Sequence, residues 1–123
     1  MKQINKNQLR QFISKNQAID NSLYDQLKKL KVVKSMDSLS VLCGRTTSYY
    51  RSMKAKRMGL KLASLTMLRE HLSVRMEMAD DPQQSVIYGY GMRAVEQAIR
   101  SKVLLQESSG KRNERISNKR LHQ

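Results

Sequence analysis

Apolar residues recur every three or four positions along most of the chain, which is the spacing of one face of an α-helix. The clearest stripe places Leu65, Leu68, Leu72 and Met76 on one side of a helix. The same spacing predicts helices over about 5–17, 22–33, 37–43, 46–56, 62–78 and 82–105. Strand-like patterns are confined to 30–33 and 85–90, and the chain has only 5 Gly and 1 Pro. We therefore predict an all-α fold.

Short polar residues precede several of these helices and can cap them, because their side-chain oxygens accept hydrogen bonds from the free N–H groups of the first turn. The candidate caps are Asp20 or Asn21 for 22–33, Ser35 or Asp37 for 37–43, Thr46, Thr47 or Ser48 for 46–56, and Asp81 for 82–105. Pro82 would take the first position of the last helix, where its missing N–H costs nothing.

The last predicted helix has a mixed pattern. Val95, Ala98, Ile99 and Val103 mark its buried face. Its first half contains Tyr88-Gly89-Tyr90-Gly91, which weakens the helix prediction there. Two conformations stay open for this stretch: a loop, or a helix packed very closely against another.

The composition changes from residue 107 onward, where basic residues dominate and Ile116 and Leu121 are the only large apolar side chains. Such a segment cannot bury enough apolar surface to fold alone. We predict a single helical domain over 1–106 and a flexible basic tail over 107–123. The tail would add nonspecific affinity for nucleic acid by neutralising phosphates.

The net charge of the chain indicates the kind of partner that the protein binds. The 123 residues include 24 Lys plus Arg and 10 Asp plus Glu, so the net charge is +14. A charge of this size attracts polyanions such as nucleic acid. No acidic residue stands between Asp37 and Glu70, whereas the same stretch holds Arg45, Arg51, Lys54, Lys56, Arg57, Lys61 and Arg69. A solvated face normally mixes both signs, so this one-sided run favours a polyanion partner.

Several classes of chemistry lack the residues they need. Cys43 is the only cysteine, so an intrachain disulfide is excluded, and His71 and His122 stand at no metal-binding spacing. We predict no metal and no cofactor, and we interpret His71 as a half-buried structural residue. The sequence shows no paired acid and base and no phosphate loop, so we predict that the protein is not an enzyme. The absence of a signal peptide or a membrane-span pattern predicts a cytoplasmic location without membrane association.

The segment Leu39–Met53 carries the spacing of a helix-turn-helix. Two helices that cross at close range need a small residue between them, and Ser40 fits. The turn needs a residue that tolerates positive φ, and Gly44 follows Ser40 by four positions. The apolar residues that would hold the pair together are Leu39, Cys43, Tyr50 and Met53. This pattern predicts a helix-turn-helix over about 36–56.

The stretch resembles the helix-turn-helix of the lambda-repressor-like (Cro and Xre-type) DNA-binding family. Lys54–Arg57 stands where that family often has a small or basic exit from the recognition helix, and Leu62–Leu72 resembles the helix that follows. The resemblance covers roughly 22–72. It implies a DNA-binding transcriptional regulator whose second helix enters the major groove, usually as a dimer on paired half-sites. The residue after the turn glycine is usually aliphatic in the family and is Arg45 here, so either Arg45 extends to a phosphate or the turn has a different geometry.

Small polar residues at the start of the second helix can approach phosphate, and its exposed face can reach base edges. Ser48, Tyr49, Arg51 and Ser52 are predicted to lie on that exposed face, with Arg51 as the best candidate for a bidentate contact with guanine. The full set of predicted DNA-binding residues is Arg45, Thr46, Thr47, Ser48, Tyr49, Arg51, Ser52, Lys54, Lys56 and Arg57.

We expect double-stranded DNA as the partner, a homodimer formed through a dimerisation helix at about 82–105, and the transcription machinery as a further partner. A second hypothesis is an RNA- or transcription-complex-binding protein of the antiterminator or ribosome-associated type, without sequence-specific DNA readout. A third is a small adaptor that binds a protein through its helical faces. The adaptor hypothesis predicts that Arg51→Ala and Lys54→Ala leave function intact.

Overall fold

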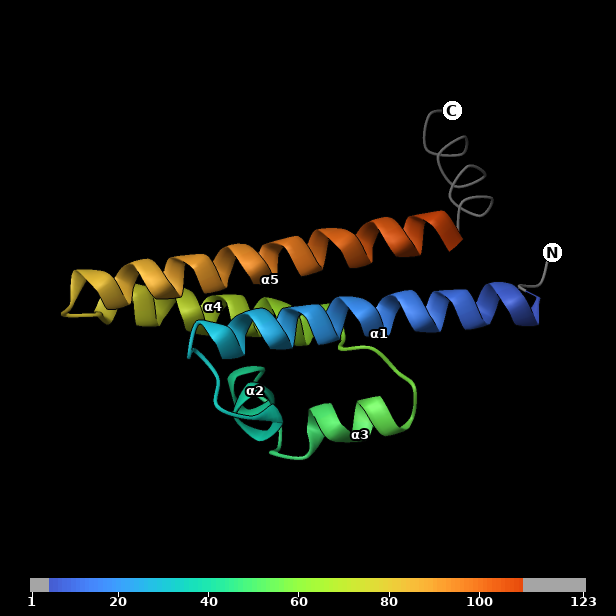
Figure 1. The fold of residues 1–123 in the computed structure, drawn as a ribbon, viewed down its shortest axis with the longest axis horizontal. Helices are drawn as coiled ribbons and strands as arrows, with labels where there is room; N and C mark the ends of the chain where they lie inside the picture. The colour runs from blue at the N-terminus through green and yellow to red at the C-terminus, as the bar shows by residue number, and fades with distance from the viewer. Residues whose placement is uncertain (1–4, 110–123) are drawn as a thin grey trace, which may run out of the picture.

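A computed structural model of the protein describes residues 5–109, which form five α-helices (Figure 1). They are α1 (Lys6–Lys29), α2 (Met36–Leu42), α3 (Tyr49–Ala55), α4 (Leu62–Met78) and α5 (Pro82–Ser109). No strand occurs in this described range, so the all-α prediction is confirmed. The basic tail predicted over 107–123 begins inside α5, and its residues 110–123 lie outside the described range.

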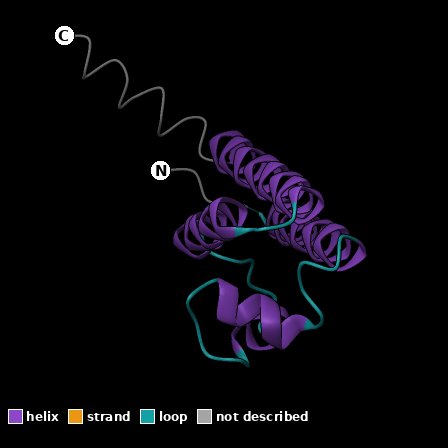
Figure 2. Ribbon diagram, turned by 90° about the vertical axis from the view of Figure 1, so that its left-hand side faces the viewer, coloured by secondary structure: helices purple, strands orange, loops and turns teal. Residues whose placement is uncertain are grey.

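The three long helices α1, α4 and α5 lie alongside one another, and the short helices α2 and α3 are set against one side of them (Figure 1 and Figure 2). α5 packs against both α1 and α4, and it runs antiparallel to α1. α2 packs against α3 and α4. The short pair therefore lies on one side of the long helices and packs on them through α4.

One aliphatic core joins the long helices to the short pair. Six apolar residues of the long helices are no more than 1% exposed: Leu23, Leu27, Leu65, Leu68, Leu72 and Val95. Leu39 and Tyr50 bring α2 and α3 into the same cluster. Cys43 also belongs to it, and burial raises the pKa of its thiol to about 12. The thiol is therefore neutral and structural at physiological pH.

α1 is a single helix of 24 residues, whereas the sequence predicted two helices over 5–17 and 22–33. That prediction was wrong because it took Asp20 or Asn21 as a cap, and Asp20 instead lies buried in the helix interior. The N-cap is Asn5, whose side chain accepts a hydrogen bond from the backbone N–H of Gln8 at 2.8 Å. No Gly or Pro stands between the two predicted segments, so nothing interrupts the backbone hydrogen bonds.

Asp20 forms a buried ion pair that ties three parts of the fold together. Its Oδ1 lies 2.6 Å from Nζ of Lys102 on α5, and both side chains are almost fully buried. Its Oδ2 accepts the N–H of Leu60 at 2.8 Å, and Lys102 donates to the carbonyl of Leu60 at 2.7 Å. Burial raises the pKa of Asp20 and lowers that of Lys102, and the opposite charge of each partner counteracts both shifts. The network links α1 and α5 to the α3–α4 loop (residues 56–61).

α5 begins at Pro82 as predicted, and Asp81 caps it by accepting the N–H of Gln83 at 2.9 Å. The stretch 88–91 is helical, which decides between the two conformations in favour of close packing. A Cβ on the buried Gly91 would lie 3.4 Å from methyl groups of both Leu27 and Leu72.

The predicted buried face of α5 is confirmed for Val95 and Ala98. The prediction is wrong for Val103, which is 36% exposed. The neighbouring Lys102 takes the inward position instead, because its ammonium group pairs with Asp20. The helix also continues to Ser109, past its predicted end near residue 105.

α4 has its predicted bounds, and α2 begins one residue earlier than predicted. Ser35 is the cap of α2, and its side chain accepts the N–H of Ser38 at 3.2 Å. His71 is half-buried as predicted, with Nδ1 2.6 Å from the carbonyl oxygen of Leu42. The strand-like segment 30–33 forms the turn that leads from α1 to α2, with a positive φ of 61° at Lys31.

Candidate nucleic-acid interface

Ser40 joins the two short helices, as the helix-turn-helix pattern predicted. Its Oγ accepts the backbone N–H of Tyr50 on α3 at 2.9 Å and donates to the carbonyl of Met36 at 2.9 Å. The side chain is 0% exposed, so a larger residue would push the helices apart. Leu39, Cys43, Tyr50 and Met53 are all buried around it, which confirms the predicted scaffold.

Gly44 provides the turn with the positive φ that the pattern required, at 74°. Its N–H donates to the carbonyl of Val41 at 2.9 Å, and the N–H of Arg45 donates to that of Ser40 at 3.1 Å. A Cβ at this position would also stand 3.1 Å from Cγ of Met67 on α4. Both the conformation and the space favour glycine here.

The turn is longer than predicted, because α3 begins at Tyr49 rather than at Thr46 or Thr47. The N–H of Tyr49 donates to the carbonyl of Thr46 at 3.1 Å, which closes a separate turn before the helix. The side chain of Ser48, the N-cap residue, makes no capping hydrogen bond, so the predicted capping role is wrong. Thr46, Thr47 and Ser48 are all exposed in the 43–48 turn.

Arg45 packs on Tyr49 and α4. Its guanidinium carbon lies 5.2 Å from the centre of the Tyr49 ring, and its Nε donates to Oγ of Ser64 at 3.3 Å. Ser64 donates in turn to the hydroxyl of Tyr49 at 3.0 Å. Tyr49 is half-buried by these contacts, so its predicted place on the exposed face is wrong. Arg45 itself stays exposed beside a turn that keeps its positive-φ glycine.

Arg51 and Ser52 are exposed on α3 as predicted, and Lys54 is exposed on the same helix. Nε of Arg51 lies 3.0 Å from Oδ1 of Asp37 at the start of α2. Sequence reasoning treated Asp37 only as a cap and as the edge of the basic run, and so missed this pair. The side chain of Arg51 is 58% exposed, and the pair uses Nε rather than the terminal amino groups. The amino groups are the donors that a bidentate contact with guanine requires.

The α3–α4 loop carries Lys56 and Arg57, which are both exposed. Arg57 has a positive φ of 57°. The N–H of Met58 donates back to the carbonyl of Met53 at 2.8 Å, which is the hydrogen bond of a helix that ends in a left-handed residue. Glycine is usual at such a position, so a side chain here is unusual.

Searches with this chain against protein-family models, curated proteins and solved structures found no match. The resemblance to the Cro and Xre-type family therefore rests on the residues named above. Among residues 5–109, no group of three or more His, Cys, Asp or Glu side chains is arranged to hold a metal ion. In the same range, no helix combines the length and apolar character needed to cross a bilayer.

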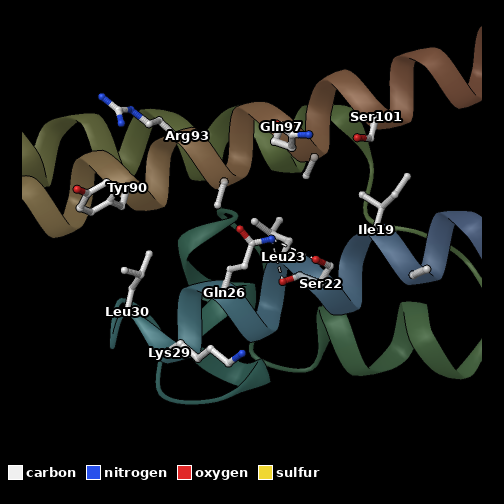
Figure 3. Close-up of a pocket in the computed structure, with 13 residues that line it drawn as sticks. Ile19, Ser22, Leu23, Gln26, Lys29, Leu30, Tyr90, Arg93, Gln97 and Ser101 are labelled. Atoms are coloured by element: carbon white, nitrogen blue, oxygen red, sulfur yellow. Dashed lines mark hydrogen bonds between the residues drawn. The ribbon is translucent and has the colours of Figure 1, made fainter.

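A groove of about 860 Å³ lies between α1 and α5 on the long helices (Figure 3). Its lining includes the buried Leu23, Ala94 and Ala98, and Tyr90 and Leu30 stand at one end of it. The charged residues in its lining are Lys29 and Arg93, both basic. A homodimer formed through 82–105 stays a prediction.

Proposed function

We propose that this protein binds double-stranded DNA through the exposed surface of α2, the 43–48 turn, α3 and the α3–α4 loop, and that it acts as a transcriptional regulator. One observation carries the proposal. The helix pair packed through Ser40 and Gly44 presents a strongly basic surface, in which the only carboxylate between residues 36 and 61 is Asp37. The exposed cations of this surface are Arg45, Arg51, Lys54, Lys56, Arg57 and Lys61. Duplex phosphates attract such a surface.

The roles of the surface residues follow from their positions. Arg51 and Ser52, on the exposed side of α3, would reach base edges in the major groove. The hydroxyls of Thr46, Thr47 and Ser48 and the cations Arg45, Lys54, Lys56 and Arg57 would bind phosphates and set the register. Tyr49 would act by holding Arg45 in place, because its ring packs against the guanidinium and its hydroxyl is already bound to Ser64.

Fluorescence anisotropy with a random-sequence duplex, measured over a range of salt, tests the proposal. Six neutralised phosphates predict a slope of roughly −5 in log affinity against log salt. Lys54→Ala should reduce the slope by about one, and the matched control Arg100→Ala, an exposed cation on α5, should not change it. Selection of bound sequences from a random duplex pool then tests sequence readout. A flat salt response together with no selected consensus would refute DNA binding.

RNA binding is the second candidate function, and the short length of α3 favours it. α3 spans 7 residues, about two turns, so few side chains of the helix can read bases. A protein without base readout would bind single-stranded RNA as well as duplex DNA. Titrating both ligands at the same salt concentration separates the two functions. Tighter binding to RNA would replace the DNA proposal with an antiterminator or ribosome-associated role.

The proposed regulator would act in the cytoplasm. It would bind DNA as a homodimer, because proteins of this kind read paired half-sites one helical turn apart. Sedimentation with and without a selected duplex measures the number of chains bound. Two chains on a palindromic site support the dimer, and one chain on a site without symmetry contradicts it.

A further inference from the structure

A cleft of about 450 Å³ opens next to the proposed DNA surface, between the first half of α1, the α3–α4 loop and the end of α5. This volume falls within the usual range for small-molecule sites. The three walls come from segments far apart in the sequence, which Asp20 fastens together through its ion pair with Lys102 and its hydrogen bond to Leu60.

The walls of the cleft are mainly apolar. α1 contributes Leu9, Phe12 and Ile13, and the opposite side includes Met58 and Leu105. Leu9 is 47% exposed and Met58 is 46% exposed, so apolar surface faces solvent on both sides. Phe12 is the only phenylalanine in the protein. An apolar group placed between these walls would remove this surface from water.

The charged residues at the cleft are all basic. Lys56, Arg57 and Lys61 are exposed cations in its lining, and no carboxylate lines it. Lys102 also lines the cleft, but its ammonium group is already bound to Asp20 and to the carbonyl of Leu60. The exposed cations therefore complement an anion whose apolar part lies between the walls.

The backbone at Arg57 is left-handed, with a φ of 57° that costs a side-chain-bearing residue roughly 1 kcal/mol or more and that glycine adopts freely. Lys31 has the same conformation at the end of α1, so the φ value marks a helix end, and a place in the lining of the cleft distinguishes Arg57. Arg57 stands where the cleft meets the proposed DNA surface.

We propose that this cleft binds a small amphiphilic anion, with an apolar chain between α1 and the α3–α4 loop and a carboxylate or phosphate head on Lys56, Arg57 and Lys61. Such a ligand would compete with DNA, because the head would occupy cations that the phosphates also need. The competition rests on the proposed function, whereas binding of the anion does not.

Isothermal titration of the full-length protein with decanoate, below its micelle concentration and without DNA, tests the site. We expect saturable binding of decanoate, at least ten-fold weaker binding of decanol, and no detectable binding of butyrate. Equal affinity for decanol and decanoate would overturn the proposal. Binding to anionic vesicles without binding of monomeric decanoate would also overturn it and indicate a membrane surface instead.

Two matched pairs of variants locate the site. Arg57→Gly should weaken decanoate binding about ten-fold, and Lys31→Gly should not, although both replace a left-handed basic residue at a helix end. Leu9→Ser should weaken it, and Leu104→Ser, a similarly exposed leucine outside the cleft, should not. Equal effects within either pair would refute this location.

Competition between decanoate and DNA is then measured separately, as release of labelled duplex by decanoate. Binding without release would leave the site intact and refute only its link to DNA.

Discussion

The carboxylate of Asp37 and the guanidinium of Arg51 meet at 3.0 Å between Oδ1 and Nε, which joins the start of α2 to the exposed face of α3. The side chains are 46% and 58% exposed, so the pair contributes little to stability, at most about 1 kcal/mol. Its effect should lie in binding, because the carboxylate repels phosphate and also orients the arginine.

Asp37→Asn should therefore tighten binding to random duplex a few-fold at low salt and reduce the preference for a selected sequence. Removal of the carboxylate lowers repulsion, and Arg51 loses the partner that orients its amino groups. Anisotropy with both duplexes measures the two affinities, and Asp25→Asn on α1 is the exposed control. No difference between the two variants would contradict this role of Asp37.

Ser40→Ala should destabilise the fold by about 1–3 kcal/mol, because the backbone N–H of Tyr50 would lose its buried acceptor. Urea unfolding followed by circular dichroism measures the change. Ser52→Ala, an exposed serine on α3, should change stability by less than about 0.5 kcal/mol. Equal effects of the two substitutions would mean that Ser40 does not hold the helix pair together.

The helices and their scaffold residues could largely be predicted from the sequence. The spacing of apolar residues and the positions of glycine and proline determine the conformation of the segment in which they stand. The stripe of Leu65, Leu68 and Leu72 located α4, and Asp81 with Pro82 located the start of α5. Ser40 and Gly44 were found because a helix-turn-helix requires small residues at those offsets.

Several of the errors come from side chains whose partners are distant in sequence. Asp20 has the side chain of a typical helix cap, and its true partner Lys102 lies 82 positions further along the chain. No local pattern therefore indicates the partner in the buried ion pair. One signal was present: Asp20 shares a helix face with Leu23 and Leu27, so a charge stood in an apolar stripe. The contacts of Tyr49 with Ser64 and of Asp37 with Arg51 depend on how α3 crosses α4 and α2, and no local sequence pattern specifies these crossings.

Two glycine substitutions should have opposite effects. Gly44→Ala should cost roughly 1–2 kcal/mol, because φ is 74° and Met67 stands 3.1 Å from the new Cβ. Gly91→Ala should stabilise the fold by roughly 0.5–1 kcal/mol, because alanine favours the helix and the new Cβ meets only ordinary contacts at 3.4 Å. Thermal unfolding of both variants measures the direction of each change in stability. Destabilisation by Gly91→Ala would show that α5 is packed too tightly for one methyl group.

Stability should fall above pH 9 through Cys43. Its thiol pKa rises from 9.0 to about 12 on burial, so the folded state keeps a proton that the unfolded state releases. A group with a raised folded-state pKa loses its stabilising contribution as pH rises, here by about 1 kcal/mol between pH 9 and 10. Urea unfolding at pH 7, 9 and 10 measures the loss. Cys43→Ala should show a smaller decrease over the same interval, and identical slopes would rule out the cysteine as its source.

Arg57→Gly and Lys31→Gly should raise stability by similar amounts and differ in DNA binding. Both residues have a positive φ, 57° and 61°, at the end of a helix, so glycine relieves the same backbone cost of roughly 1 kcal/mol. Lys31 follows α1 and stands outside the proposed DNA surface, whereas Arg57 follows α3 within it. Arg57→Gly should therefore bind duplex more weakly and lower the salt slope by about one, although its fold is more stable. Loss of binding in a stabilised variant cannot come from unfolding. If Lys31→Gly weakens binding equally, the effect is one of overall charge, and the surface formed by α3 and the α3–α4 loop is not the DNA site.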